Sequence, residues 1–261
     1  MKEFNSEALC AEPVFYRTYS RKKENNKRET LEEVARRAAE GMAYFGNLSE
    51  EETEFLYNHY LNLKSLPAGR WLWVGGTPWV DNLNNHYSAF NCTSLPIYKP
   101  HYFGLLSYLA MQGCGTGANL EDKYISQLPI INNRLKLSVI HEPGQKLPKD
   151  RYEKTVISTV GRFVRIIVGD SKEGWRDAYQ SLIDTAMSLE FDLKVVEVEL
   201  DFSSVRPAGE PLKGFGGVAN PSTLPKQFLK IGKLLNKAVG RRLTAEECCL
   251  LIDEMSSAIV S

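Results

Sequence analysis

The feature that most constrains the fold is a strand–helix–strand pattern between residues 162 and 202. RFVRIIV (162–168) is apolar enough for a strand, and VVEVELDF (195–202) alternates apolar and acidic residues like a half-buried one. Between them, Asp170 and Glu173 begin a segment whose apolar residues recur at helical spacing. Because parallel strands need such a crossover, the pattern predicts a right-handed βαβ unit.

Capping signals predict helices in other parts of the chain. Thr30 begins a helical pattern over 30–45, and Ser49 with Glu52 has the spacing of a capping box before a helix at 49–63. Thr244 with Glu247 caps the last helix in the same way. Further helices are expected after Pro100 and over 224–238.

These patterns predict a helical region at residues 1–65, followed from residue 66 to 261 by an α/β domain. Residues 1–28 are expected to be loosely structured. The segment 130–161 is expected to hold a short strand and an exposed excursion.

Composition excludes several classes of protein. With 261 residues, of which 43% are hydrophobic and 25% charged, the chain can bury one large core or two smaller ones. A formal net charge of zero argues against a strong field for nucleic acid. No apolar run approaches the roughly 20 residues of a membrane span, and the N-terminus has no signal-peptide core. We therefore expect a cytoplasmic protein with no membrane or direct nucleic-acid partner.

The five cysteines predict free thiols and no metal site, since none has CxxC or Cys/His metal spacing. Cys248 and Cys249 lie within a predicted helix and are expected to be buried. Cys92, in AFNCTSLPI, is the cysteine most expected to react, because Asn91, Thr93 and Ser94 could hydrogen-bond a thiolate or a ligand. The commoner role of a free cysteine is that of a buried structural thiol, and this alternative stays open.

Two loops at strand ends could bind a ligand. RPAGEPLKGFGG (206–217) follows the second strand of the βαβ unit, at the end where such folds bind ligands. Its glycines let the backbone approach a ligand closely, and Arg206 and Lys213 could contact a phosphate or a base. GDSKEGW (169–175) opens the crossover helix, so its free N–H groups favour an anion. An ordinary connecting role is an equal alternative for both loops.

GCGTGANL (113–120) is a third Gly-rich segment. Its glycines at 113, 115 and 117 do not match the dinucleotide fingerprint, and it follows a predicted helix rather than a strand. It is predicted to be a turn of close backbone approach.

Six segments, taken in order, resemble the adenosylcobalamin-dependent (class II) ribonucleotide reductases, most closely the monomeric ribonucleoside-triphosphate reductase branch. The resemblance covers nearly the whole chain from Tyr16 onward, and its last two segments are specific in combination. The six are RTYSRKKENNKRETLEE, LPAGRWLWVGGTP, FNCTSLPI, GCGTGANLEDKYISQLP, VGDSKEGW and RPAGEPLKGFGG.

The resemblance implies a fold and an activity. The fold would be a helical N-terminal region followed by the first part of a ten-stranded α/β barrel, incomplete in this chain, with an effector-binding insertion around 121–195. The activity would be reduction of the 2′-hydroxyl of ribonucleoside triphosphates by a thiyl radical, controlled by deoxynucleoside triphosphate effectors. It would need adenosylcobalamin, whose binding region is expected in the missing C-terminal part, and a dithiol reductant such as thioredoxin.

The resemblance also assigns roles to residues. Cys92 would be the first cysteine of the redox-active pair, with its partner absent from the chain. Asn91, Gly113, Gly115 and Gly117 would contact the substrate. RPAGEPLKGFGG, called the specificity loop below, would lie between substrate and effector bases. The effector and specificity residues would be Asp170, Ser171, Arg206, Pro207, Gly209, Lys213, Gly214 and Gly216.

We further expect this chain to be the N-terminal half of a reductase. The last predicted helix runs to Ser261 without a glycine stop, and the resemblance places the thiyl-radical cysteine beyond it. The chain alone would then be inactive and would need a C-terminal reductase half. The alternative is a non-catalytic nucleotide-binding module left from a split or truncated reductase. A diiron-dependent (class I) large subunit is disfavoured by the DSKEGW segment and by the lack of an N-terminal ATP-binding helical cone.

Overall fold

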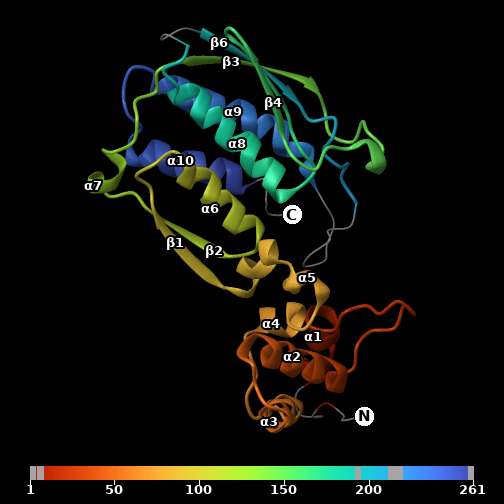
Figure 1. Ribbon diagram of the computed structural model, residues 1–261. Helices are drawn as coiled ribbons and strands as arrows, with labels where there is room; N and C mark the ends of the chain where they lie inside the picture. Colours follow the sequence, from red (N-terminus) through yellow and green to blue (C-terminus); the bar gives the residue numbers. More distant parts are fainter. Residues whose placement is uncertain (1–3, 5–8, 192–194, 211–219, 258–261) are drawn as a thin grey trace. The chain divides into compact units, whose positions relative to one another are not determined.

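The computed structural model describes residues 4, 9–191, 195–210 and 220–257 (Figure 1). The chain forms two compact units, Met1–Asn91 and Cys92–Ser261. This division lies later than the boundary expected near residue 66, because residues 69–89 pack with the N-terminal helices. Trp71 and Val74, for example, are buried in the core of the first unit. Across the described residues, no helix has the length and apolar character needed to cross a membrane.

The first unit is helical, and the capping box predicted at Ser49 is present, as is a second one at Thr30, which was predicted only as an N-cap. Thr30 and Ser49 each accept a hydrogen bond from the N3 backbone, while Glu33 and Glu52 reach back to the N-cap. Its helices are α1 (Ala11–Thr18), α2 (Leu31–Gly46), α3 (Glu50–Leu61), α4 (Gly69–Val74), α5 (Pro78–Asp81) and a 3₁₀ helix, Leu83–Ala89.

Residues 9–28 are more ordered than expected. Phe15 of α1 is buried in the core of the first unit and contacts Phe4 and Tyr16. Lys22 and Arg28 form an antiparallel bridge. The sequence did not predict this order, because the stretch that includes the bridge contains six Lys and Arg residues and resembles a solvated segment.

The second unit contains two sheets with helices between them (Figure 1). β1 (Cys92–Pro96) pairs in parallel with β2 (Gly115–Asn119). The larger sheet has the order β3–β6–β5–β4, in which β4 is antiparallel and the others are parallel. Its strands are β3 (Arg134–His141), β4 (Val156–Val160), β5 (Phe163–Ile167) and β6 (Val195–Asp201).

Helices α8 and α9 contact the larger sheet, while α6 contacts β1 and β2. α6 also packs on α8, and α10 on α9, which gives the layers seen in Figure 1. The helices are α6 (His101–Met111), α7 (Asp122–Ile125), α8 (Lys172–Met187), α9 (Leu224–Lys237) and α10 (Ala245–Ser256), with 3₁₀ helices at Pro148–Asp150 and Pro221–Thr223.

The predicted βαβ unit is present as β5, α8 and β6. Val196, Val198 and Leu200 of β6 are buried in the main core, whereas Glu197 and Glu199 alternate with them on the other face. The α/β class expected from the sequence is therefore confirmed. The helices predicted from Pro100, 224–238 and Thr244 are also present.

Three local expectations were wrong. The Gly-rich segment after α6 is strand β2 rather than a turn, because pairing with β1 holds residues of low strand propensity in an extended form. The segment 130–161 was expected to hold one strand, but it contains two, β3 and the exposed β4, and β4 forms a hairpin with β5. Cys249 is exposed, since it lies beside Cys248 on a helix with only one buried face.

Candidate functional site

The turn at 169–175 and the specificity loop, which are far apart in the sequence, meet at Asp170. This residue follows β5, and its Oδ1 accepts hydrogen bonds from the backbone N–H of Arg206 at 3.0 Å and from the Arg206 Nε at 2.9 Å. Both side chains are nearly buried, at 11% and 15% exposure. Since Arg206 follows β6, the contact joins the ends of two neighbouring parallel strands, as expected for a ligand site in an α/β sheet.

Arg151, a residue not singled out in the sequence, extends this contact into an ion network. Its Nη1 lies 3.4 Å from Asp170 Oδ2, and its two terminal nitrogens bind Glu210 at 2.7 and 2.6 Å. The Arg151 guanidinium holds the pKa of Glu210 below its ordinary value. The network thus joins the excursion at 130–161, the turn at 169–175 and the specificity loop. No sequence spacing indicates that Arg151 reaches the other two.

The excursion is also bound to the start of α8. Ser171, the N-cap, donates its hydroxyl to Glu153 O at 2.6 Å and accepts from Gly174 N at 2.9 Å. The Thr155 hydroxyl donates to Gly174 O, and Gly169 N donates to the same hydroxyl. The expected anion-binding turn is therefore built against the backbone of the excursion.

A second charged group lies where β3 and β6 end. Asp201 is buried, and its Oδ2 lies 3.2 Å from His141 Nδ1 and 3.4 Å from Arg165 Nη2. Burial alone would raise the pKa of Asp201, but hydrogen bonds from Ser203 and His141 outweigh it, so the pKa is lowered. The carboxyl ends of three parallel strands thus carry paired charges.

The specificity loop is described only in part. Pro207 lies against Gly144, where an added Cβ would come within 2.9 Å of the proline Cβ. Gly209 has a φ of +91° and open space around it. Lys213, Gly214 and Gly216, which were also expected to contact ligand, lie outside the described residues.

The strand pair β1–β2 brings Cys92 beside the Gly-rich segment. Cys92 is in register with Gly115 at the start of both strands and is exposed. Gly117 pairs with Ser94, and a Cβ at Gly117 would make only ordinary contacts of 3.6 Å. Gly113 and Gly115 are exposed, so this end of the pair is open to solvent. Asn91 is exposed and is the last residue of the first unit.

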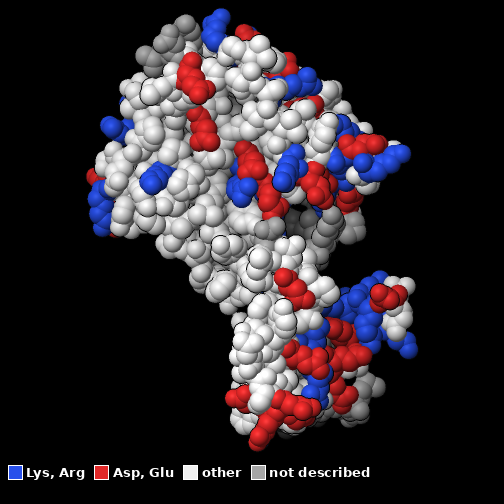
Figure 2. Space-filling model, in the orientation of Figure 1, with Lys and Arg blue, Asp and Glu red and all other residues white. Residues whose placement is uncertain are grey.

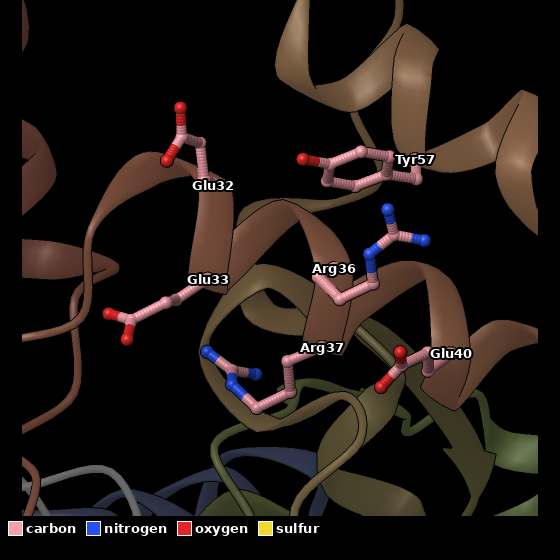
Figure 3. A pocket seen from close by; sticks show the side chains of 6 residues that line it. All are labelled: Glu32, Glu33, Arg36, Arg37, Glu40 and Tyr57. Atoms are coloured by element: carbon pink, nitrogen blue, oxygen red, sulfur yellow. The ribbon is translucent and has the colours of Figure 1, made fainter. Parts of the chain in front are cut away.

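The first unit carries a hollow of about 390 Å³ between α2 and α3 (Figure 3). Its lining is charged, with Arg36 stacked 3.5 Å from the centre of the Tyr57 ring and bound to Glu54. The hollow is lined by Glu and Arg side chains. It is too small for a corrinoid and lacks the apolar surface that a corrinoid would contact, so we place no cobalamin contact there. The described residues hold no group of three His, Cys, Asp or Glu that could bind a metal ion.

Charges of both signs are intermixed on the visible face of the second unit (Figure 2). This fits the zero net charge of the sequence.

Comparisons with known proteins point to one family. Residues 146–235 match the family "B12-dependent ribonucleotide reductase, insertion domain". Residues 3–77 match the "Ribonucleotide reductase alpha domain". The first of these matches includes Arg151, Asp170, Arg206 and Glu210.

Curated relatives and a solved structure agree. The adenosylcobalamin-dependent ribonucleoside-triphosphate reductase of Lactobacillus helveticus (strain DPC 4571) is 26% identical over 95% of this chain and 39% of its own. A putative reductase of the same description from Mycobacterium phage D29 is 32% identical, over 87% of this chain and 33% of its own.

The crystal structure of a B12-dependent (class II) ribonucleotide reductase matches the fold, with a TM-score of 0.76 and 22% identity. It covers 97% of this chain and 40% of that chain. The present chain therefore spans about one third to two fifths of the length of these proteins.

Proposed function

The chain belongs to the B12-dependent (class II) ribonucleotide reductases, and from this premise we propose that it is the portion that binds the allosteric effector and carries one redox cysteine. The observation that carries the proposal is the contact between Asp170 and Arg206. It joins the turn expected to bind effector to the loop expected to read the substrate base. A nucleotide bound at either segment would act directly on the other.

The reaction proposed for the complete enzyme is reduction of a ribonucleoside triphosphate to the deoxynucleotide. The 2′-hydroxyl leaves as water, and a pair of cysteines supplies two electrons and becomes a disulfide. Cys92 would be one of this pair, and an external dithiol such as thioredoxin would reduce the disulfide again. Its exposed position at the start of β1, in register with Gly115, suits a thiol that must meet both substrate and reductant.

The other site residues have positioning roles in this proposal. Gly115 and Gly117 present backbone without a side chain beside Cys92, where a nucleotide could approach closely. Asn91 and Gly113 would contact the same substrate. Adenosylcobalamin would supply the radical, and its contacts are assigned to the remainder of the enzyme, together with the second cysteine.

The remaining parts of the proposal concern partners and location. The chain would work with a C-terminal reductase half in the cytoplasm, and its ligands would be ribonucleoside triphosphates and deoxynucleoside triphosphates. The second candidate function, a non-catalytic nucleotide-binding module, would use the same contact between Asp170 and Arg206.

Binding and reconstitution test the two functions. Titration with each deoxynucleoside triphosphate, followed by calorimetry and by hydrogen exchange over 169–175 and 203–206, should show binding and added protection. If no nucleotide binds, both functions are wrong. Mixing the chain with a polypeptide that supplies the rest of the enzyme, plus adenosylcobalamin and a dithiol, should yield deoxynucleotides. Binding without any activity in the mixture would favour the non-catalytic module.

A further inference from the structure

Arg151 is held firmly from within the protein, while its partner Glu210 reaches solvent. The Arg151 side chain is 8% exposed and donates from Nε to Lys146 O at 3.2 Å and from Nη1 to Asp170 at 3.4 Å. Glu210, by contrast, is 32% exposed and is bound through both carboxylate oxygens. The cation is therefore fixed, and the anion is the exchangeable member of the pair.

A phosphate could replace Glu210 without rearrangement of Arg151. The planar fork of a guanidinium binds two oxygens of a carboxylate or of a phosphate in the same manner. Arg151 and Arg206 carry two positive charges, and Asp170 and Glu210 carry two negative ones. An incoming polyanion would thus have to displace one carboxylate, and Glu210 is more exposed than Asp170.

Displacement of Glu210 would release the described residues 207–210 of the specificity loop. Gly209 precedes it with a φ of +91°, and no atom of the described residues lies within 4 Å of an added Cβ there. Glycine has more backbone conformations open to it than other residues, so a change of direction at this position is sterically inexpensive. Arg206 stays bound to Asp170 through both its backbone and its side chain. Residues 207–210 can therefore move away from Arg151 while Arg206 remains in place.

On the basis of the proposed nucleotide-binding function, we propose that the Arg151–Glu210 pair is a latch that holds residues 207–210. A phosphate group of the bound nucleotide takes the place of Glu210 on Arg151 and releases residues 207–210. Arg151 then binds the phosphate and, by giving up Glu210, couples nucleotide binding to the release of residues 207–210.

Two substitutions in the full-length protein should shift affinity in opposite directions. Glu210→Gln removes the competing anion and should tighten deoxynucleoside triphosphate binding about threefold to tenfold at constant ionic strength. Arg151→Ala removes the phosphate contact and should weaken it by about tenfold or more. Matched controls are Glu254→Gln, whose partner is Lys230, and Arg241→Ala, which removes another bidentate pair. Neither control should change the affinity.

The double variant and hydrogen exchange complete the test. In the Arg151→Ala background, Glu210→Gln should no longer tighten binding, because its effect acts through Arg151. Either single variant should raise exchange at residues 208–210 without nucleotide. A merely structural pair would shift affinity in the same direction in both variants, and that result would overturn the latch.

Titration with inorganic tripolyphosphate distinguishes a failure of the latch from a failure of the proposed function. If it binds and Glu210→Gln strengthens its binding, the phosphate contact is supported even without a base. If nucleotides bind no better than tripolyphosphate, the effector function is wrong while the latch stands. If nucleotides bind the wild type but both variants leave affinity unchanged, only the latch is wrong.

Discussion

Cys92 and Cys249 are both exposed thiols, so exposure alone does not identify a redox cysteine. Cys92 begins a strand opposite Gly115, whereas Cys249 lies on α10 and donates to Asp253 at 3.6 Å. In the reconstituted enzyme, Cys92→Ser should abolish multiple turnovers supported by a dithiol, because the disulfide cannot form. Cys249→Ser is the matched control and should retain turnover. Unchanged turnover in Cys92→Ser would make Cys92 a structural thiol.

Cys248 should behave as a core residue. It is fully buried, and burial raises the pKa of its thiol to about 12. In native protein at pH 8, a thiol reagent should therefore modify Cys92 and Cys249 but leave Cys248 unmodified, because the thiolate is the reactive form. Cys248→Ser should lower the free energy of unfolding by about 1–3 kcal/mol, since it buries a hydroxyl. Rapid native labelling of Cys248 would contradict this placement.

At the scale of elements, the packing of the excursion on α8 depends on Gly174. An added Cβ there would lie 2.8 Å from the Gly169 Cα and 2.9 Å from Glu153 O, both backbone atoms. Gly174→Ala should therefore cost about 1–3 kcal/mol in urea unfolding and raise hydrogen exchange over 152–155. Gly117→Ala is the control for stability, because its Cβ would make only ordinary contacts. Equal unfolding free energies for the two variants would show that the excursion is not held by this packing.

Some helices and strands can be predicted from their own residues, and others cannot. Helices α2, α3 and α10 could be predicted because a capping box marks each start and apolar spacing follows it. β2 could not, since GTGAN has no strand-like side chains and becomes a strand only by pairing with Cys92–Pro96. The same limit applies to the site. Asp170 and Arg206 were found because each follows a predicted strand, whereas Arg151 and Glu210 meet only through the tertiary fold.

At the scale of the whole molecule, we predict that these 261 residues alone do not carry out the reduction. The chain aligns with about two fifths of proteins described as adenosylcobalamin-dependent reductases. The resemblance assigns the thiyl-radical cysteine and the cobalamin region to the remainder. The purified 261-residue chain with adenosylcobalamin and a dithiol should therefore form no deoxynucleotide. Measurable product, absent from a boiled control, would show that the radical chemistry lies within this chain.

The two compact units should also unfold separately, because each has its own hydrophobic core. Val74 and Val198 are both fully buried, one in each unit. Truncation to alanine removes two methyl groups and leaves a small cavity, at a cost of about 2 kcal/mol in the unit that contains it. Calorimetry should show two transitions, with Val74→Ala lowering the midpoint of one and Val198→Ala that of the other. A single transition that both variants shift equally would mean that the two cores unfold as one cooperative structure.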